Sequence, residues 1–369
     1  MSYVNNKNLI YKFYSTRSLK GFAKNFLLKS MAGQKIFLYN KNIPRVINIS
    51  FNEHTCMFKC KICPYSQNEV AEMYKQKKEM SFETLKNIVS SVPNDSFYSF
   101  DISSIGETLE FKNLAKFISY MKEQKPLVNT IISTNGLLLN EKIARDLIKS
   151  GLDNIQFSLF AGDEDGHKFV TQSDSFTKVK KNIINFKKIK DSLGSKTPFT
   201  QTFMIETKEN KHLSNSFVEE WSSFVDKAFI RQMYKMGHPI DGMTPSYEDE
   251  NINHKKERYP CVAPWYSTSI ISNGDVLGCY MFNWHAKEKE SMVIGNINKN
   301  TLSEIYTSKN NQDFRDNQLD LNFKSCEACK DCNLWDAYTN IWEKDSKSYK
   351  YSSLKVFDFF NTKLEYRGG

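Results

Sequence analysis

The sequence predicts an α/β protein whose strands form a mainly parallel sheet. Between residues 46 and 232, short apolar segments alternate with longer amphipathic segments, which predicts strands alternating with helices. Ser81 and Asn140, residues suited to helix capping, stand where two of the amphipathic segments begin. Because parallel neighbours need a crossover connection, usually a helix, this alternation favours a sheet that is either doubly wound or curled towards a barrel.

The bounds of these elements follow from where each pattern starts and stops. Strands are expected at 46–51, 98–102, 129–133, 154–159, 200–205 and 228–231. Helices are expected at 81–91, 112–123, 140–150, 176–191 and 213–224. Further along, Asn273-Gly274 separates the apolar runs 268–272 and 275–277, a combination that predicts a β-hairpin.

Changes in composition divide the chain into regions. Residues 1–45 are expected to be a basic N-terminal extension, with a helix near Leu19 to Met31, where apolar residues recur at helical spacing among lysines. The remaining regions are a main domain at 46–232, a polar linker at 233–258, a smaller domain at 259–345 and a tail at 346–369.

The bulk composition is that of a globular protein. With 369 residues, 40% of them hydrophobic, the chain can bury a large core. It lacks an apolar run of membrane-spanning length and a secretory signal, so we expect a cytoplasmic protein with no membrane span. The net charge of +9 is spread along the chain. It permits an anionic substrate or partner, but no motif indicates nucleic-acid binding.

The cysteines point to metal chemistry. The chain has 8 of them, at positions 56, 60, 63, 261, 279, 326, 329 and 332, with none in the long stretch between the two groups. A disulfide framework would spread its cysteines through a small secreted domain. Two tight groups in a chain of cytosolic character instead indicate metal binding.

The first group follows the first expected strand. Its thiolates at Cys56, Cys60 and Cys63 suit zinc, copper(I) or an iron–sulfur cluster, and His54 lies close enough in sequence to complete a zinc site. The Cys-x3-Cys-x2-Cys spacing after a first strand resembles the signature of the radical S-adenosylmethionine superfamily. That resemblance implies a [4Fe–4S] cluster on the three cysteines, S-adenosylmethionine bound to its open iron, and an adenine contact from Ile62.

Three further segments agree with the resemblance. Gly106-Glu107 follows the second strand, Asn135-Gly136 follows the third, and Ser158 lies near the end of the fourth. In the family, the segment at Glu107 binds the amino group of methionine, although its usual first glycine and its proline are replaced here. The resemblance implies cofactor contacts from Gly106, Glu107, Asn135 and the ribose-binding position Ser158, and it implies a partial (β/α)6 TIM-like barrel.

The second group of cysteines is expected to form another centre. A hairpin turning at Gly274 would bring Cys261 and Cys279 together, and four thiolates suit either zinc or an iron–sulfur cluster. The segments 261–265, 274–279, 295–297 and 302–306 resemble the SPASM/Twitch extension of radical enzymes. That resemblance implies a smaller α+β domain holding one auxiliary [4Fe–4S] cluster. The ligands it implies are Cys261, Cys279, Cys326 and Cys329.

Cys332 is then left over, unless it replaces one of its neighbours as a ligand. As a free thiol reaching the substrate it would be a candidate hydrogen donor, which would give an epimerase. An auxiliary cluster that accepts an electron would give an oxidation instead.

The resemblance implies a radical enzyme supplied with electrons by a reductant such as flavodoxin or ferredoxin. The product of cofactor cleavage would be a 5′-deoxyadenosyl radical that abstracts hydrogen from the substrate. Because residues 1–45 are too few for a separate leader-peptide-binding domain, we expect a small-molecule substrate such as a sugar or aminocyclitol. The alternatives are a maturase that modifies a ribosomal peptide, an iron–sulfur dehydratase, and a non-catalytic zinc-binding or electron-carrier protein.

Overall fold

The computed structural model describes residues 42–54, 56–66, 71–72, 74–96, 98–233, 243, 258–279, 292–324, 326, 329–330, 332, 335, 342–345 and 348–351. The expected N-terminal helix, most of the 233–258 linker and the last part of the tail lie outside these residues. None of the helices in the described part of the chain has the length and apolar character needed to cross a bilayer.

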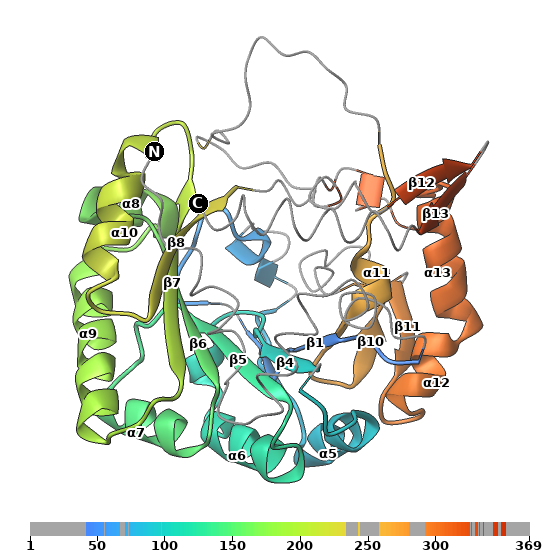
Figure 1. The fold of residues 1–369 in the computed structure, drawn as a ribbon, viewed down its shortest axis with the longest axis horizontal. Coiled ribbons are helices and arrows are strands. Elements are labelled where there is room, and N and C mark those ends of the chain that lie inside the picture. Colours follow the sequence, from blue (N-terminus) through green and yellow to red (C-terminus); the bar gives the residue numbers. More distant parts are fainter. Residues whose placement is uncertain are drawn as a thin grey trace.

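A nine-stranded sheet, in the order β11-β10-β9-β1-β4-β5-β6-β7-β8, forms the centre of the protein (Figure 1). Six of these strands are all paired in parallel: β1 (Val46–Ile49), β4 (Ser99–Ile102), β5 (Asn129–Thr134), β6 (Asn154–Phe160), β7 (Phe199–Glu206) and β8 (Lys227–Gln232). The predicted strands are therefore confirmed, and with their helices they make the partial barrel.

Helices connect the parallel strands and cover one face of the sheet (Figure 1). They are α5 (Phe82–Ser91), α6 (Leu114–Gln124), α7 (Glu141–Lys149), α8 (Glu164–Thr171), α9 (Phe176–Ser192) and α10 (Ser214–Trp221). The predicted caps are confirmed, since Ser81 accepts from the backbone N–H of Thr84 and Asn140 from that of Ile143. Helix α8 was not predicted.

Short elements complete this part of the chain. Strand β2 (Asn52–Glu53) pairs antiparallel with β3 (Lys78–Glu79). Single 3₁₀ turns lie at η2 (Pro64–Ser66), η3 (Thr108–Glu110) and η4 (Lys211–Leu213).

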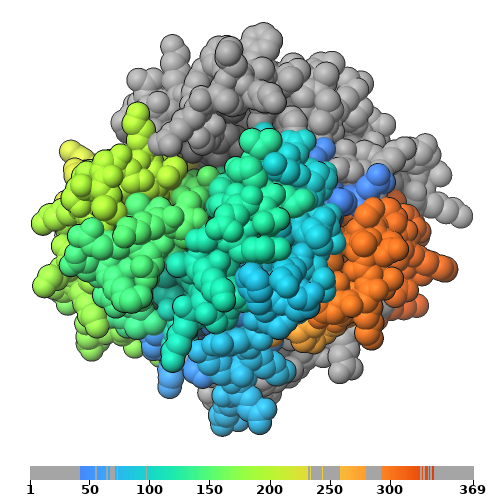
Figure 2. All heavy atoms as spheres, turned by 90° about the horizontal axis from the view of Figure 1, so that it is seen from below, coloured from blue at the N-terminus to red at the C-terminus, as the bar shows by residue number. Residues whose placement is uncertain are grey.

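The C-terminal region continues the same sheet. Strand β9 (Ser267–Ile270) pairs in parallel with β1, and it forms the predicted hairpin with β10 (Asp275–Leu277), which turns at Gly274 with a φ of +88°. The other elements of this region are α11 (Ala263–Tyr266), β11 (Val293–Asn296), α12 (Leu302–Thr307), α13 (Lys309–Leu319), β12 (Trp342–Asp345) and β13 (Ser348–Tyr351). Seen from below, the orange C-terminal region lies directly beside the cyan helices (Figure 2), where Asn87 of α5 donates to Asn298 at 3.2 Å.

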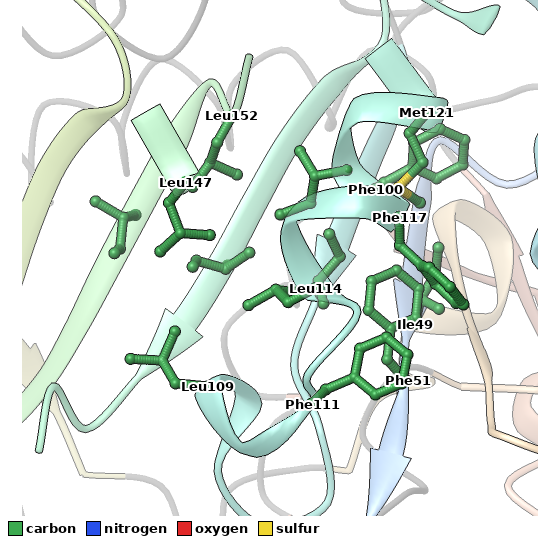
Figure 3. Close-up of a cluster of buried hydrophobic side chains, with 14 of the residues drawn as sticks. Ile49, Phe51, Phe100, Leu109, Phe111, Leu114, Phe117, Met121, Leu147 and Leu152 are labelled. Carbon is green, nitrogen blue, oxygen red and sulfur yellow. The ribbon is translucent and has the colours of Figure 1, made fainter. Parts of the chain in front are cut away.

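The helix-covered face of the sheet holds the main core (Figure 3). Phe51, Phe111 and Phe117 meet there with ring centroids 4.8 to 5.5 Å apart, and Phe100 and Ile102 of β4 are fully buried on the same side. Alternate residues of each strand point the other way, into the concave side, because side chains alternate along a strand. The inner face is therefore lined by a different and more polar set of residues.

A repeated polar arrangement secures the edge of the barrel where strands begin. Lys190 at the end of α9 donates to Asp226 at 2.7 Å, and Asp226 also accepts from the N–H and the hydroxyl of Thr200, each at 2.9 Å. Lys122 of α6 and Asp153 repeat the same contacts one unit earlier. The candidate functional site is therefore expected at the opposite edge, where the parallel strands end.

Candidate functional site

The first cysteine loop follows β2 and is held by the unpredicted helix α8. The N–H groups of Lys59 and Lys61 donate to the carbonyls of Thr171 and Val170, at 3.2 and 2.8 Å. Gln172, which follows α8, donates from its side chain to the Lys59 carbonyl at 2.7 Å. The loop that carries the thiols is thus fixed from behind by backbone contacts.

The thiols of Cys56, Cys60 and Cys63 are free and lie near enough to affect one another's ionisation. Burial, reinforced by the Cys63 and Cys56 thiols, raises the pKa of Cys60 well above its usual value. Burial likewise raises the pKa of Cys56 to about 12. Neighbouring buried thiols that repel each other's negative charge need a cation to ionise together. The donor set therefore fits a metal cluster.

Gly106 packs its backbone directly against this cysteine loop. The N–H of His54 donates to the Ile105 carbonyl at 3.0 Å, and a Cβ built on Gly106 would lie 2.3 Å from the His54 carbonyl oxygen. Gly106 also has a φ of +99°, which side chains rarely adopt. Only glycine lets the loop after β4 approach the residues before Cys56 this closely.

Glu107 is a buried carboxylate that joins two of the predicted motifs. Its Oε1 accepts from the Leu109 N–H at 2.9 Å and the Thr134 hydroxyl at 2.5 Å, and its Oε2 accepts from the Asn135 N–H at 2.9 Å. Burial raises the pKa of Glu107, and these hydrogen bonds oppose that rise. Since each carboxylate oxygen can accept two hydrogen bonds, Oε2 keeps acceptor capacity for a ligand donor.

Asn135 extends the connection to the cysteine loop. Its Nδ2 lies 3.3 Å from Met57 Sδ and 3.8 Å from Cys56 Sγ. The Gly136 carbonyl behind it accepts from the side chain of Asn182 at 2.9 Å. The structure thus brings Gly106, Glu107 and Asn135 together with the first cysteines.

Ile62 and Ser158 lie in different surroundings. Ile62 packs beside a cluster formed by Val170, Met233 and Met243, next to Phe160. Ser158 is partly buried on the concave side of β6, and no hydrogen bond joins its side chain to the other predicted residues in the described ranges. The structure therefore leaves Ser158 apart from the hydrogen-bonded group.

The second cysteine group gathers around α11, the β9–β10 hairpin and the loop after α13. Cys279, Cys326 and Cys329 are buried in one cluster, and Cys261 and Cys332 pack against it. The sulfurs of Cys326 and Cys329 are 3.0 Å apart. Contact with Cys326 and burial raise the pKa of Cys329 well above its usual value, and burial, then Cys332, raises that of Cys261 to about 12. All five thiols thus share one neighbourhood.

Arg258 holds the loop that carries the last cysteines, a role that the sequence did not indicate. Its Nη1 donates to the Cys332 carbonyl at 2.8 Å and its Nη2 to the Cys329 carbonyl at 2.9 Å. The guanidinium also lies over the rings of Phe323 and Trp335, at 4.8 and 4.7 Å. Its positive charge stands beside thiols that must become anionic to bind metal.

Among the described residues, no three His, Cys, Asp or Glu side chains converge on a point where one metal ion would bind. A single zinc ion draws its thiolates to about 2.3 Å from one centre. In a [4Fe–4S] cluster each thiolate binds its own iron, so the sulfurs need not converge.

Comparison with known proteins identifies both parts of the chain. The model of the radical SAM superfamily matches residues 54–200, and that of SPASM, an iron-sulfur cluster-binding domain, matches residues 261–333. An uncharacterised protein of Methanocaldococcus jannaschii is 25% identical over 208 residues, 55% of this chain and 68% of that protein. A GTP 3′,8-cyclase of Campylobacter jejuni is 29% identical over 178 residues, 42% of this chain and 54% of the cyclase.

The chain therefore spans about half the length of that cyclase. Among solved structures, anSMEcpe with bound AdoMet and a Cp18Cys peptide aligns with 88% of this chain and 99% of its own, at 17% identity and a TM-score of 0.54. This likeness confirms the fold, a parallel partial barrel with a smaller C-terminal domain.

Proposed function

Because this chain belongs to the radical SAM superfamily and carries a SPASM domain, we propose that it is an enzyme that removes a hydrogen atom from a small polar substrate and oxidises it. The two domains are those of proteins that use a [4Fe–4S] cluster with S-adenosylmethionine and an auxiliary iron–sulfur centre. The observation that carries the proposal is that the eight cysteines form no disulfide and gather in two separate groups, with Asn135, which Glu107 holds, beside Cys56 of the first.

In this proposal Cys56, Cys60 and Cys63 hold the first cluster, and Cys261, Cys279, Cys326 and Cys329 hold the auxiliary one. When bound, the first cluster and S-adenosylmethionine supply a 5′-deoxyadenosyl radical that abstracts hydrogen from an unactivated carbon. The protein contributes binding, orientation and the exclusion of water.

The residues beside the first group would orient the cofactor. Glu107 Oε2 has capacity for a hydrogen bond from the ammonium group of methionine. Ile62 and Phe160 offer an apolar surface against which the adenine would pack, and water would be kept from it. Ser158, on the same concave side, would contact the ribose.

Oxidation is the proposed outcome because the auxiliary thiols gather around the β9–β10 hairpin, which continues the barrel sheet, so an electron acceptor there would be held close to the barrel. Epimerisation would instead require Cys332 to donate a hydrogen atom to the substrate radical. A sugar or an aminocyclitol is the proposed kind of substrate, and a flavodoxin or ferredoxin the proposed reductant.

The test is anaerobic purification, followed by measurement of iron and sulfide per chain and of 5′-deoxyadenosine formed with S-adenosylmethionine and a reductant. We expect roughly eight irons per chain, two clusters' worth. A Cys60→Ala variant should contain about four irons per chain and form no 5′-deoxyadenosine. A Cys279→Ala variant should also contain about four irons per chain but should still form 5′-deoxyadenosine. A protein that contains only zinc and forms no deoxyadenosine would refute the proposal.

A further inference from the structure

The concave side of the barrel carries polar residues to which the proposed function assigns no cofactor contact. Asp101 of β4, Gln156 of β6 and Arg231 of β8 all lie on this side, because their sequence neighbours Phe100, Ile102 and Phe157 are buried on the helix-covered side. All three side chains keep some surface open to solvent. A ligand entering the barrel can therefore reach them.

The curvature of the sheet brings these residues towards one another. In the strand order, β5, β6 and β7 separate β4 from β8, so in a flat sheet the two strands would be about 19 Å apart. Yet Arg231 donates from Nη2 to the Gln156 side-chain oxygen at 3.1 Å, and its charge acts on Asp101. The guanidinium therefore lies over the concave face of the sheet and not beyond the edge strand β8.

Arg231 is held in that position by more than one contact. Its guanidinium lies 4.2 Å above the ring of Phe203 and 5.5 Å from that of Phe229. Gln156, which accepts its hydrogen bond, in turn donates to the Ser133 hydroxyl at 3.3 Å. A guanidinium oriented in this way is suited to bind a carboxylate or a phosphate.

Asp101 lies on the same concave face, and its carboxylate accepts no hydrogen bond from the residues that the structure describes. Within the described residues, it also forms no ion pair with Arg231. Burial raises the pKa of Asp101 to about 6, against the lowering effect of Arg231. A carboxylate removed from water in this way gains from a ligand that supplies a donor.

A second cation lies on the same side. Lys227, four residues before Arg231 on β8, has its pKa lowered to about 8 by burial and by the nearby Arg231 charge. Among the described residues, Lys227 is thus a second cationic side chain beside Arg231 on the concave side, and both would attract an anion that enters the barrel.

We propose that Asp101 and Arg231 bind the two ends of one small anionic hydroxy compound, with its carboxylate or phosphate on Arg231 and a hydroxyl group on Asp101. This inference rests on the proposed function to the extent that the ligand is the substrate of the radical reaction. It narrows the substrate class from polar small molecules in general to hydroxylated anions.

The test uses the cluster-loaded protein with S-adenosylmethionine, under anaerobic titration calorimetry. The probes are glycerol 3-phosphate, which has both an anionic group and hydroxyls, and inorganic phosphate, which has no carbon-bound hydroxyl. We expect Arg231→Met to weaken binding of both probes at least tenfold and Arg231→Lys to restore part of it. Asp101→Asn should weaken the binding of glycerol 3-phosphate roughly fivefold, which corresponds to the loss of about one hydrogen bond. The affinity for inorganic phosphate should stay the same or increase.

Exposed residues of α7 provide matched controls: Arg145→Met and Asp146→Asn should change neither affinity. Undetectable binding of glycerol 3-phosphate to the unmodified protein, or equal affinities in Arg231→Met, would overturn the inference. So would an Asp101→Asn effect that is the same for both probes. Iron content and deoxyadenosine formation, measured on the same samples, report separately on the proposed function.

Discussion

Replacing Asp101 with asparagine is expected to stabilise the folded protein, because the substitution removes a desolvated carboxylate from the concave side of the sheet. Burial raises the pKa of Asp101 from 3.8 to about 6. At about 1.4 kcal/mol per pKa unit, this rise corresponds to a penalty on the order of 3 kcal/mol when the group is ionised. Partial exposure of the side chain makes that figure an upper limit.

The sign of the pH dependence follows from proton binding. Between the unfolded and folded pKa values the folded state binds more protons than the unfolded state, so the free energy of unfolding falls as the pH rises through this window. Above a pH of about 6 the full penalty is present. The difference in the free energy of unfolding between Asp101→Asn and the unmodified protein should therefore grow, in favour of the variant, by up to about 1 kcal/mol between pH 5.5 and pH 8.

Urea unfolding of the anaerobic, cluster-loaded protein at these two pH values measures the effect. The control is Asp146→Asn, because the side chain of Asp146 on α7 is 44% exposed and its ion pair with Lys142 lies at the surface. The control variant should show no pH-dependent gain. An Asp101→Asn protein that is less stable than the unmodified one at pH 8 would mean that the carboxylate is not desolvated as the structure indicates.

Two further substitutions test other parts of the fold. Lys190→Met should lower the free energy of unfolding in urea by about 1 to 2 kcal/mol, because it removes the buried cation from Asp226, which is partly open to solvent and keeps its hydrogen bonds from Thr200. Lys187→Met, which removes a surface ion pair of α9, should change it by less than about 0.5 kcal/mol. Gly106→Ala should lose iron and unfold more easily, by roughly 3 kcal/mol, because its methyl group would meet a backbone carbonyl oxygen. Gly194→Ala is the control, with a positive φ but open space around it; if both alanine variants retained iron equally, the close packing of the Gly106 loop would be in doubt.

The parallel strands were predictable because each is an apolar run bounded by polar turns and separated from the next by a helical pattern. The caps at Ser81 and Asn140 and the turn at Gly274 were predictable because one residue type satisfies a local backbone requirement at each position. The gathering of Cys261 and Cys279 was predictable because the turn at Gly274 folds the chain between them into a hairpin.

Long-range contacts were not predictable in the same way. Helix α8 is short and mixed in character, and it owes its place to the cysteine loop that it backs. Arg258 is one basic residue in a polar segment, and its partners lie about 70 residues further along the chain. Asp101 and Arg231 come together only because the sheet curls, a property that periodicity does not report.

The continuity of the sheet decides how the two groups of thiols are placed. Strand β9 pairs with β1 along its whole length, so the C-terminal hairpin is an edge of the barrel sheet. Glu53, the last residue of β2, accepts from both the N–H and the hydroxyl of Ser272, at 3.0 and 2.5 Å. A buried carboxylate thus ties the chain before the first cysteine loop to the turn of the hairpin that leads to Cys279. Because that tie and the strand pairing both resist separation, the fold itself fixes the β9–β10 hairpin, around which the second group of thiols gathers, against the chain that leads to the first group.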